Sequence, residues 1–356
     1  MGIVIGEVVN LFNSLGDLEA TVTASFLTLS NLVSIAKFYA IAKHQEKILK
    51  LANLINRKEF KPKSDVQLLI LKEYIKTSKV ISGLMYGGCI FTCVFWAIYP
   101  FTEDGDVFLP IAAWIPFKTN TSPSFEIVYV YEIIATVIGG LTDLSADCLI
   151  AGFIMVICAQ FKILNDSLVN IKQFAIEEMN SEWMGDDVNG EISPVLQEIM
   201  NKKLLECVIH HRYILEFSNE VYFLFTTSIL GQFAVSVIII CTTLFEMTLV
   251  SFPSVKLFSL ILYQYCMLME IFIVCYFGNE VILESSKLTN FAYRSDWPNC
   301  SQEFKRNLLF FMTRSQRASK LYAGGFFTLS LETFVRILKS SWSYFVVLIQ
   351  VNKEDL

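Results

Sequence analysis

The residues best suited to chemistry in this sequence are carboxylic acids placed inside apolar segments. Asp143 and Asp147 stand four positions apart, and Glu270 lies near the middle of another apolar run. Residues four apart share one face of a helix, so the two aspartates could form a general acid–base pair. Ionisable groups in a membrane segment are costly unless they face protein or water, which makes each of these acids a candidate functional residue.

Catalysis is nevertheless the weaker interpretation, because no nucleophile motif or phosphate-binding glycine loop accompanies the acids in the sequence. His210 and His211 lack partners for a zinc site. Cys89 and Cys93, one helical turn apart, are more typical of small packing residues than of ligands. We therefore predict no enzyme, no metal and no cofactor. A structural or hydrated-interface role is favoured for the aspartates, while Glu270 stays open between a structural role and an ion or ligand path.

The composition places these acids in a membrane protein. Hydrophobic residues make up 54% of the chain and charged residues 17%, against roughly 25% charged residues in soluble domains. Apolar runs recur along the whole length without a linker rich in Gly, Ser or Pro, which predicts one all-α polytopic domain over residues 1–356. The net charge of −6 gives no reason to expect nucleic acid as a partner. None of the nine cysteines falls in a segment that we place outside the cell, so no disulfide scaffold is expected.

Runs of about 20 apolar residues, the length of one membrane crossing, occur six times. They are residues 18–42, 78–100, 125–160, 219–250, 256–283 and 323–351. Residues 2–12 are also apolar, but a helix of about 11 residues rises only about 16 Å. We favour the interpretation that they end a further span whose start precedes this chain, over that of an interfacial helix.

Lysine and arginine counts predict the orientation, because basic residues concentrate in cytosolic loops. Eleven lie in 37–79, five in 162–212 and seven in 287–320, whereas 101–126 holds only one. The basic loops are therefore predicted to be cytosolic and the C-terminus extracellular. In agreement, Asn120 begins an Asn-Thr-Ser glycosylation sequence in the predicted outer loop, although sequences of the same type begin at Asn165 and Asn299 on the predicted inner side.

Some helices should extend below the membrane. A helix over 125–164 would be about 60 Å long, against about 30 Å for the hydrocarbon core. We predict a cytosolic helical anchor built from 161–218 and 284–340. Glu332 and Arg336 are four residues apart and can form an ion pair, which suits a solvated or interface surface of that anchor better than a lipid-facing one.

Aromatic side chains are abundant in the outer halves of the spans. Interfacial belts explain some of them, and core packing is the commoner role for any single one. Residues deeper in the spans could instead wall an apolar pocket for a small ligand. The candidates are Phe91, Phe95, Trp96, Tyr131, Ile134 and Tyr263.

The C-terminal third carries the most specific pattern. Residues 275–297 read CYFGNEVILESSKLTNFAYRSDW, and residues 324–353 read GGFFTLSLETFVRILKSSWSYFVVLIQVNK. This combination resembles the insect odorant receptors, a family of ligand-gated cation channels, and a weaker likeness extends over nearly the whole chain. The matching positions are Cys275, Phe277, Gly278, Asn279, Glu284, Ser285, Ser286, Tyr293, Trp297, Gly324, Gly325, Phe326, Phe327, Ser330, Tyr344, Phe345 and Gln350.

The resemblance implies the seven-helix fold of that family, here with a truncated first helix, and a tetramer around one pore. The second half of the last helix would line the pore, with Val347, Gln350 and Val351 at the gate. The loop before the fifth helix is shorter than in the shared coreceptor. The chain therefore looks like a ligand-selective subunit that binds a small apolar volatile molecule and forms a heterotetramer with the coreceptor. The residues implied for the subunit anchor are Tyr293, Trp297, Phe326, Phe327, Glu332 and Arg336.

The implied location is the plasma membrane, in contact with membrane lipid, in the dendrites of olfactory sensory neurons. A gustatory-receptor-like channel is an alternative with a related architecture, although the Tyr344-Phe345 pair and Gln350 favour the odorant branch. A G-protein-coupled receptor is a weaker alternative. It would need an Asp-Arg-Tyr-like motif and an Asn-Pro motif that the sequence lacks, and a cytosolic C-terminus.

Overall fold

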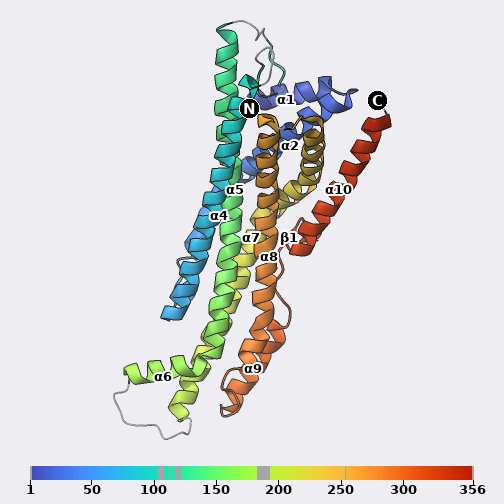
Figure 1. Cartoon of the computed structure of the whole chain (residues 1–356). Helices are drawn as coiled ribbons and strands as arrows, with labels where there is room; N and C mark the ends of the chain where they lie inside the picture. Colours follow the sequence, from blue (N-terminus) through green and yellow to red (C-terminus); the bar gives the residue numbers. More distant parts are fainter. Residues whose placement is uncertain are drawn as a thin grey trace.

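The chain is a bundle of long helices, seen here in a computed structural model that describes residues 2–102, 108–111, 113–116, 122–182, 193–252 and 254–354. Both termini lie at the same end, which we call the upper end as in Figure 1. The elements are α1 Gly2–Asn13, α2 Leu18–Lys43, α3 Gln45–Leu54, η1 Lys58–Phe60, α4 Asp65–Ile98, η2 Tyr99–Phe101, α5 Ser124–Val169, α6 Ile171–Glu182, α7 Pro194–Leu249, α8 Val255–Tyr293, α9 Gln302–Ser315, β1 Tyr322–Ala323, β2 Phe327–Thr328 and α10 Leu331–Glu354.

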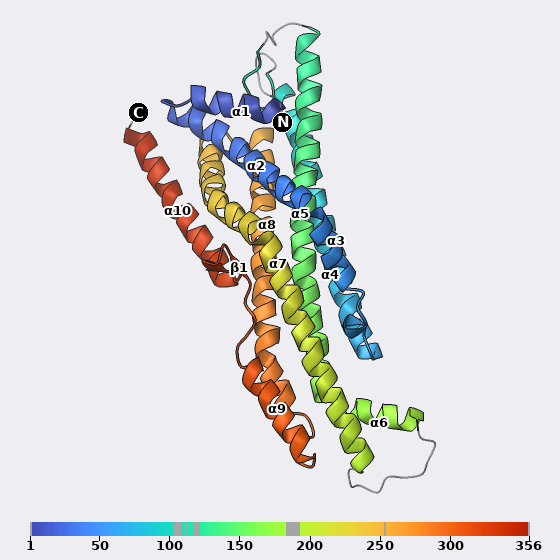
Figure 2. The same cartoon turned by 180° about the vertical axis from the view of Figure 1, so that it is seen from behind.

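Six of the described helices are long and apolar enough to cross a membrane, namely α2, α4, α5, α7, α8 and α10. They cover the six segments predicted as spans, apart from one or two residues at the ends of 78–100 and 219–250, except that the last begins later. Helix α1 is shorter than a crossing and lies across the upper end of the bundle rather than along it (Figures 1 and 2). Helix α5 is central and packs against α2, α4, α7 and α8.

Serine side chains start several of these helices. Ser64, Ser193, Ser254 and Ser301 each accept a hydrogen bond from the backbone N–H three residues ahead, at the beginning of α4, α7, α8 and α9. Such caps satisfy a backbone donor that has no partner within the helix. The chain therefore marks the lower ends of α4 and α7 and the upper end of α8 by the same local signal.

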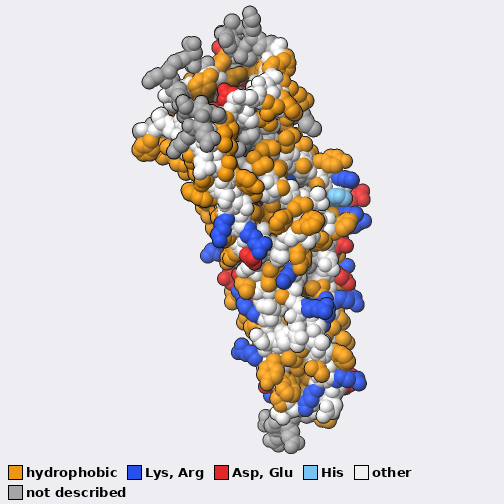
Figure 3. Space-filling model, turned by 90° about the vertical axis from the view of Figure 1, so that its right-hand side faces the viewer, with side chains coloured by type: hydrophobic (Ala, Val, Ile, Leu, Met, Phe, Trp, Pro, Cys, Tyr) orange, Lys and Arg blue, Asp and Glu red, His pale blue; other side chains and the backbone are white. Residues whose placement is uncertain are grey.

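Helices α5 and α7 continue well beyond the length of a bilayer. At about 1.5 Å per residue, the 46 residues of α5 are roughly twice as long as a hydrocarbon core of about 30 Å. Their lower halves pack together through buried aromatic rings, such as Phe153 against Phe217 at 6.0 Å, and α7 also meets α9 there, with His211 against Phe311 at 5.5 Å. On the face drawn in Figure 3, lysine and arginine side chains occupy the middle and lower parts, while the upper part is largely hydrophobic.

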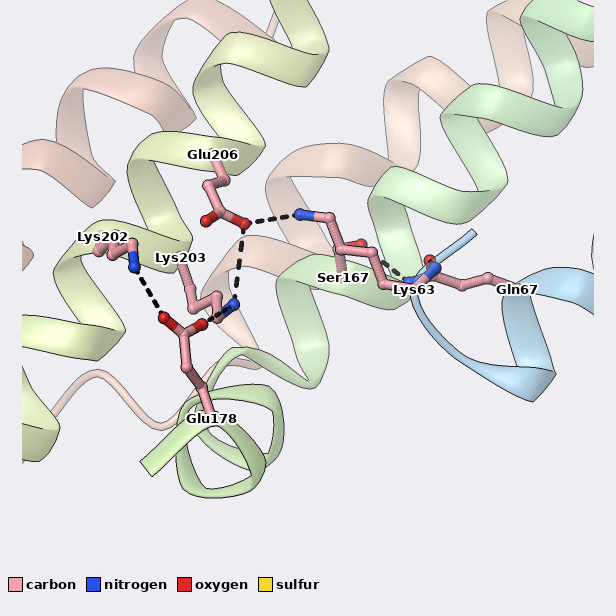
Figure 4. Close-up of polar contacts among 7 residues, drawn as sticks. All are labelled: Lys63, Gln67, Ser167, Glu178, Lys202, Lys203 and Glu206. Carbon is pink, nitrogen blue, oxygen red and sulfur yellow. Dashed lines mark hydrogen bonds and ion pairs between the residues drawn. The ribbon is translucent and has the colours of Figure 1, made fainter. Parts of the chain in front are cut away.

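Polar contacts join α6, α7 and the segment before α4 at the lower end (Figure 4). Glu178 forms ion pairs with Lys202, at 2.7 Å, and with Lys203. Lys63 lies 2.6 Å from Glu206, which is also within 3.9 Å of Lys203. Hydrogen bonds from the two lysines lower the pKa of Glu178 from 4.5 to about 2. The stabilisation from this depressed pKa is thus present above pH 4.5 and is lost only as the pH falls towards 2.

The predicted helix over 323–351 is wrong in its first turns. Residues 322–328 form a two-stranded hairpin, and α10 begins only at Leu331. Gly324 and Gly325 have positive φ angles of 60° and 76°, which glycine adopts without steric cost and which end any helix. The backbone N–H of Gly324 donates to Thr226 Oγ1 at 2.8 Å, so the hairpin is attached to α7.

Candidate functional site

A cavity lies in the upper half of the bundle between α2, α4, α5 and α8. Its volume is about 90 Å³, smaller than the roughly 150 Å³ of a cavity that takes up benzene. The lining combines aromatic, thioether, thiol and hydroxyl groups with two carboxyl groups. The lining residues are Leu27, Ser30, Asn31, Ser34, Met85, Cys89, Thr92, Cys93, Trp96, Ile111, Thr136, Gly139, Gly140, Asp143, Leu144, Tyr263, Tyr265, Cys266, Met267, Met269 and Glu270.

The upper end of the cavity is aromatic. Trp96 stacks on Tyr263 with ring centroids 5.6 Å apart, and Phe26 meets Tyr263 edge-on at 5.5 Å. Ile111, from the segment between α4 and α5, also lines the cavity, and its N–H donates to Glu132 Oε2 at 3.3 Å. These stacked and edge-on contacts favour a defined orientation of the three rings. This end therefore offers a flat, apolar contact surface to a ligand.

Glycines bring the helices close enough for thiols to form one side of the cavity. A Cβ atom at Gly140 would lie 3.0 Å from Cys89 Sγ, and one at Gly88 would lie 3.2 Å from Cys266 Sγ. Both distances are tighter than ordinary contacts between side chains. All nine cysteines are free thiols, and Cys89, Cys93 and Cys266 line the cavity. Cys89 and Cys93 were predicted to be small packing residues. In the structure they line a cavity.

The lower end of the cavity holds a cluster of buried charges. The Lys37 Nζ atom lies 2.9 Å from both carboxylate oxygens of Asp147 and 3.1 Å from Asp143 Oδ1. Gln232 Nε2 donates to Glu270 Oε2 at 3.2 Å and to Asp147 Oδ2 at 3.4 Å. We call these five residues the buried charge cluster. It joins α2, α5, α7 and α8 in the middle of the bundle.

Lys37 corrects a sequence-based assignment. We counted it among the basic residues of a cytosolic loop, yet it lies within α2 and only 2% of its surface is exposed. The aspartates were predicted to have a structural or interface role, and the structure gives both a shared cation. The i, i+4 spacing of the acids was visible in the sequence. Their partner could not be recognised, because it is 110 positions from Asp147 and resembles any lysine at the end of an apolar run.

The cavity contains two of the six aromatic and aliphatic candidates, Trp96 and Tyr263. Phe91, Tyr131 and Ile134 are 62%, 50% and 53% exposed on the outside of the bundle. Phe95 is partly buried but does not contact the cavity. These four residues therefore do not line this cavity, because both faces of an apolar helix attract aromatic residues and hydropathy cannot tell them apart.

The gate candidates lie on the free face of α10. Phe345 is buried and packs with Val22, Cys241 and Phe245 of the chain's own bundle. Val347 and Val351 are exposed, as is Gln350. A separation of two residues corresponds to about 200° around a helix, so Val347 points away from the face that contains Phe345. These three side chains are therefore open to a partner, as the resemblance implies for residues at a gate.

The six anchor candidates form two groups in the single chain. Tyr293 and Trp297 lie at the lower end of α8, with ring centroids 6.0 Å apart. Phe326 and Phe327 belong to the hairpin, which lies at mid-height in Figure 1, next to the start of α10. There Glu332 and Arg336 form the predicted ion pair, with both side chains exposed. Asn120 lies outside the described residues.

Comparison with known proteins assigns a family to this architecture. Residues 17–342 match the family model described as 7tm Odorant receptor. Odorant receptor Or1 of Anopheles gambiae is 27% identical, with 96% of this chain and 84% of that protein covered. Odorant receptor 46a, isoform A, of Drosophila melanogaster is 25% identical, with 97% and 86% covered. The structure of the insect olfactory receptor OR5 from Machilis hrabei in complex with eugenol has the same fold, with a TM-score of 0.81, 19% identity and coverage of 98% and 86%. This chain therefore belongs to the 7tm Odorant receptor family and is a multi-pass membrane receptor rather than an enzyme.

Proposed function

We propose that the chain is the ligand-selective subunit of an odorant-gated, non-selective cation channel that it forms with a coreceptor. The observation that carries the proposal is the cavity between α2, α4, α5 and α8, four helices long enough to cross a membrane, which combines an aromatic upper end with few polar groups. Such pockets bury most of a small ligand and orient it by a few hydrogen bonds. The related OR5 structure contains eugenol, a small aromatic molecule, which supports a volatile ligand here.

Ligand binding must enlarge this cavity. Its volume of about 90 Å³ is below that needed for benzene, roughly 150 Å³. Met85, Met267 and Met269 line it, and methionine side chains adapt readily to a new shape. A ligand that fits only the widened cavity binds one conformation better than the other, and this difference in affinity shifts the population towards the widened state.

Helix α8 connects the cavity to α10. Met269 and Glu270 line the cavity, and Phe272, two residues further along α8, meets Phe334 of α10 edge-on at 5.4 Å. An outward displacement of α8 by the ligand would therefore also displace the first turn of α10. We place the gate on the free face of the second half of that helix. In a fourfold assembly, Val347 and Val351 would form two apolar rings that exclude water when the pore is closed.

The charge distribution supports a defined orientation in the plasma membrane. Lysine and arginine side chains gather on the middle and lower parts of the molecule (Figure 3), and basic segments remain on the cytosolic side. The lower helices would then form the cytosolic anchor between subunits, and the C-terminus at the upper end would be extracellular. We further propose the dendrite of an olfactory sensory neuron as its location, as the resemblance to the family implies.

Filling the cavity tests the proposal. In cells that also express an insect coreceptor, Cys93→Phe should raise the half-maximal concentration of the most effective odorant by about tenfold or more, which corresponds to about 1.4 kcal/mol of lost binding. Val94→Phe is the matched control, because the neighbouring Val94 is exposed on the outside of α4. Odorant-evoked whole-cell current and surface labelling would be measured for both variants. Equal effects of the two substitutions would contradict a ligand site in this cavity.

A further inference from the structure

The lower end of the cavity has more carboxyl groups than positively charged groups to pair with them. Among the described residues, Asp143, Asp147 and Glu270 have carboxylate oxygens within 4.8 Å of one another. The Lys37 ammonium is the one cation among them, paired with both aspartates. Glu270 instead accepts a hydrogen bond from the neutral side chain of Gln232 and shares another with Asp147. The buried charge cluster therefore has an excess of acceptor oxygens over donors.

Two of these acids face the cavity. Asp143 and Glu270 are lining residues, whereas Lys37 and Asp147 are not. Asp143 is nine-tenths buried, and within the described residues its Oδ1 atom accepts no hydrogen bond of good geometry, although Lys37 Nζ is 3.1 Å away. Asp143 Oδ1 is thus ion-paired with Lys37 but lacks a well-aligned hydrogen bond from the described part of the chain. Because Asp143 lines the cavity, a donor group of a ligand can approach its carboxylate from there.

The spacing of the two ends defines the size of the ligand. Tyr263 and Glu270 are seven residues apart on α8, and Thr136 and Asp143 are seven residues apart on α5. Seven residues of helix correspond to about 10 Å. A small molecule with its apolar end against the aromatic pair thus brings its polar end to the two carboxyl groups.

We propose that the cavity selects small aliphatic amines, whose ammonium group binds Asp143 and Glu270 while the hydrocarbon part lies against Trp96 and Tyr263. This inference rests on the proposed function of the cavity as the ligand site. An ammonium group carries three donors and a positive charge, so it supplies both the missing hydrogen bond and a second cation to the cluster. Hydrogen bonds between charged partners are roughly twice as strong as neutral ones. An alcohol supplies one donor without the charge, and a hydrocarbon leaves the acceptors unpaired.

The test compares three molecules of nearly equal size: 3-methylbutylamine, 3-methylbutan-1-ol and 2-methylpentane. Their binding to the purified chain would be measured by ligand-induced thermal stabilisation, and their currents would be recorded in cells that co-express the coreceptor. We expect the amine to bind the wild type at least about tenfold more tightly than the alcohol. The alkane should bind most weakly. An amine that binds no more tightly than the alcohol would overturn the proposal without reference to any variant.

Variants then locate the selectivity. Glu270→Gln and Asp143→Asn keep the size of each side chain and remove its charge, and each should weaken amine binding about tenfold or more while alcohol binding changes less than about twofold. Glu126→Gln is the control, since Glu126 is an exposed acid at the upper end of α5. Equal losses for amine and alcohol would overturn the assignment of these two residues.

The two readouts separate this inference from the proposed function. Selective amine binding without any odorant-evoked current would support the amine site and count against the channel. Currents that prefer the alkane over the amine would support the channel and overturn the amine site. Because two independent acids are substituted, misfolding of one variant still leaves the other to decide.

Discussion

Replacing Lys37 by methionine should prevent the chain from folding stably. The substitution removes the one described cation that faces Asp143 and Asp147, and it leaves those buried acids without a counter-charge. Removal of one partner from a buried ion pair typically costs about 3–5 kcal/mol, a large share of the stability of an ordinary domain. The measurement is the fraction of expressed protein that elutes as a single species in detergent, together with its melting temperature.

Two matched variants identify the cause of this loss. Lys43→Met makes the same replacement at the exposed end of α2 and should leave the elution profile and melting temperature unchanged. Lys37→Met combined with Asp147→Asn removes a charge of each sign, so it should recover part of the lost stability. Wild-type melting behaviour of Lys37→Met alone would show that the buried charge cluster does not stabilise the bundle.

Gly278→Ala should release the hairpin and α10 from α8. A Cβ atom at Gly278 would lie 2.4 Å from Leu329 Cβ and 2.6 Å from the Leu329 carbonyl oxygen. The obstruction includes backbone, so rotation of a side chain cannot relieve it. Overpacking of this kind costs about 1–3 kcal/mol, and the displaced α10 should abolish gating. Melting temperature and odorant-evoked current would both be measured.

Gly83→Ala is the comparison variant, in which the same type of substitution should leave the melting temperature unchanged or raise it. It also lies within a helix, α4, and a Cβ atom there meets no described atom within 4 Å. Alanine is favoured over glycine in a helix by about 0.5–1 kcal/mol, so this variant should melt at the wild-type temperature or slightly above it. If Gly278→Ala behaved in the same way, the close approach of Leu329 to α8 would be incorrect.

Length and hydropathy were sufficient to predict the long helices. Five of the six apolar runs lie almost entirely in helices long enough to cross a membrane, and the sixth does so from Leu331 onward, because about 20 apolar residues in succession have few other stable arrangements. The Gly324-Gly325 pair is a recognisable hairpin signal, yet the apolar residues around it favoured extending the last helix upstream. The hairpin forms because Gly324 also hydrogen-bonds to Thr226 of α7, a contact that no local pattern contains.

The candidate site was less predictable than the fold, since it depends on which faces of the helices meet. Phe91 and Trp96 are five residues apart on α4, but Phe91 is exposed while Trp96 lines the cavity. An aromatic residue in the sequence can face either lipid or a cavity, and the residue type alone does not distinguish the two. The pairing of Lys37 with Asp147 depends on the register of α2 against α5, which is set by packing along the entire interface. Charge inside an apolar run indicated that Asp143, Asp147 and Glu270 were important without indicating their partner.

The central claim is that this chain contributes α10 to an odorant-gated pore. The most direct test is whole-cell current in cells that co-express an insect coreceptor, comparing wild type, Val351→Glu and Val351→Leu. The leucine control keeps an apolar side chain at the exposed position. We predict odorant-evoked currents in which Val351→Glu alone shifts ion selectivity or block, because an acid at the pore constriction from each copy of this chain attracts cations. Odorant-evoked currents with identical selectivity and block in all three, or currents abolished by inhibition of G proteins, would contradict the claim.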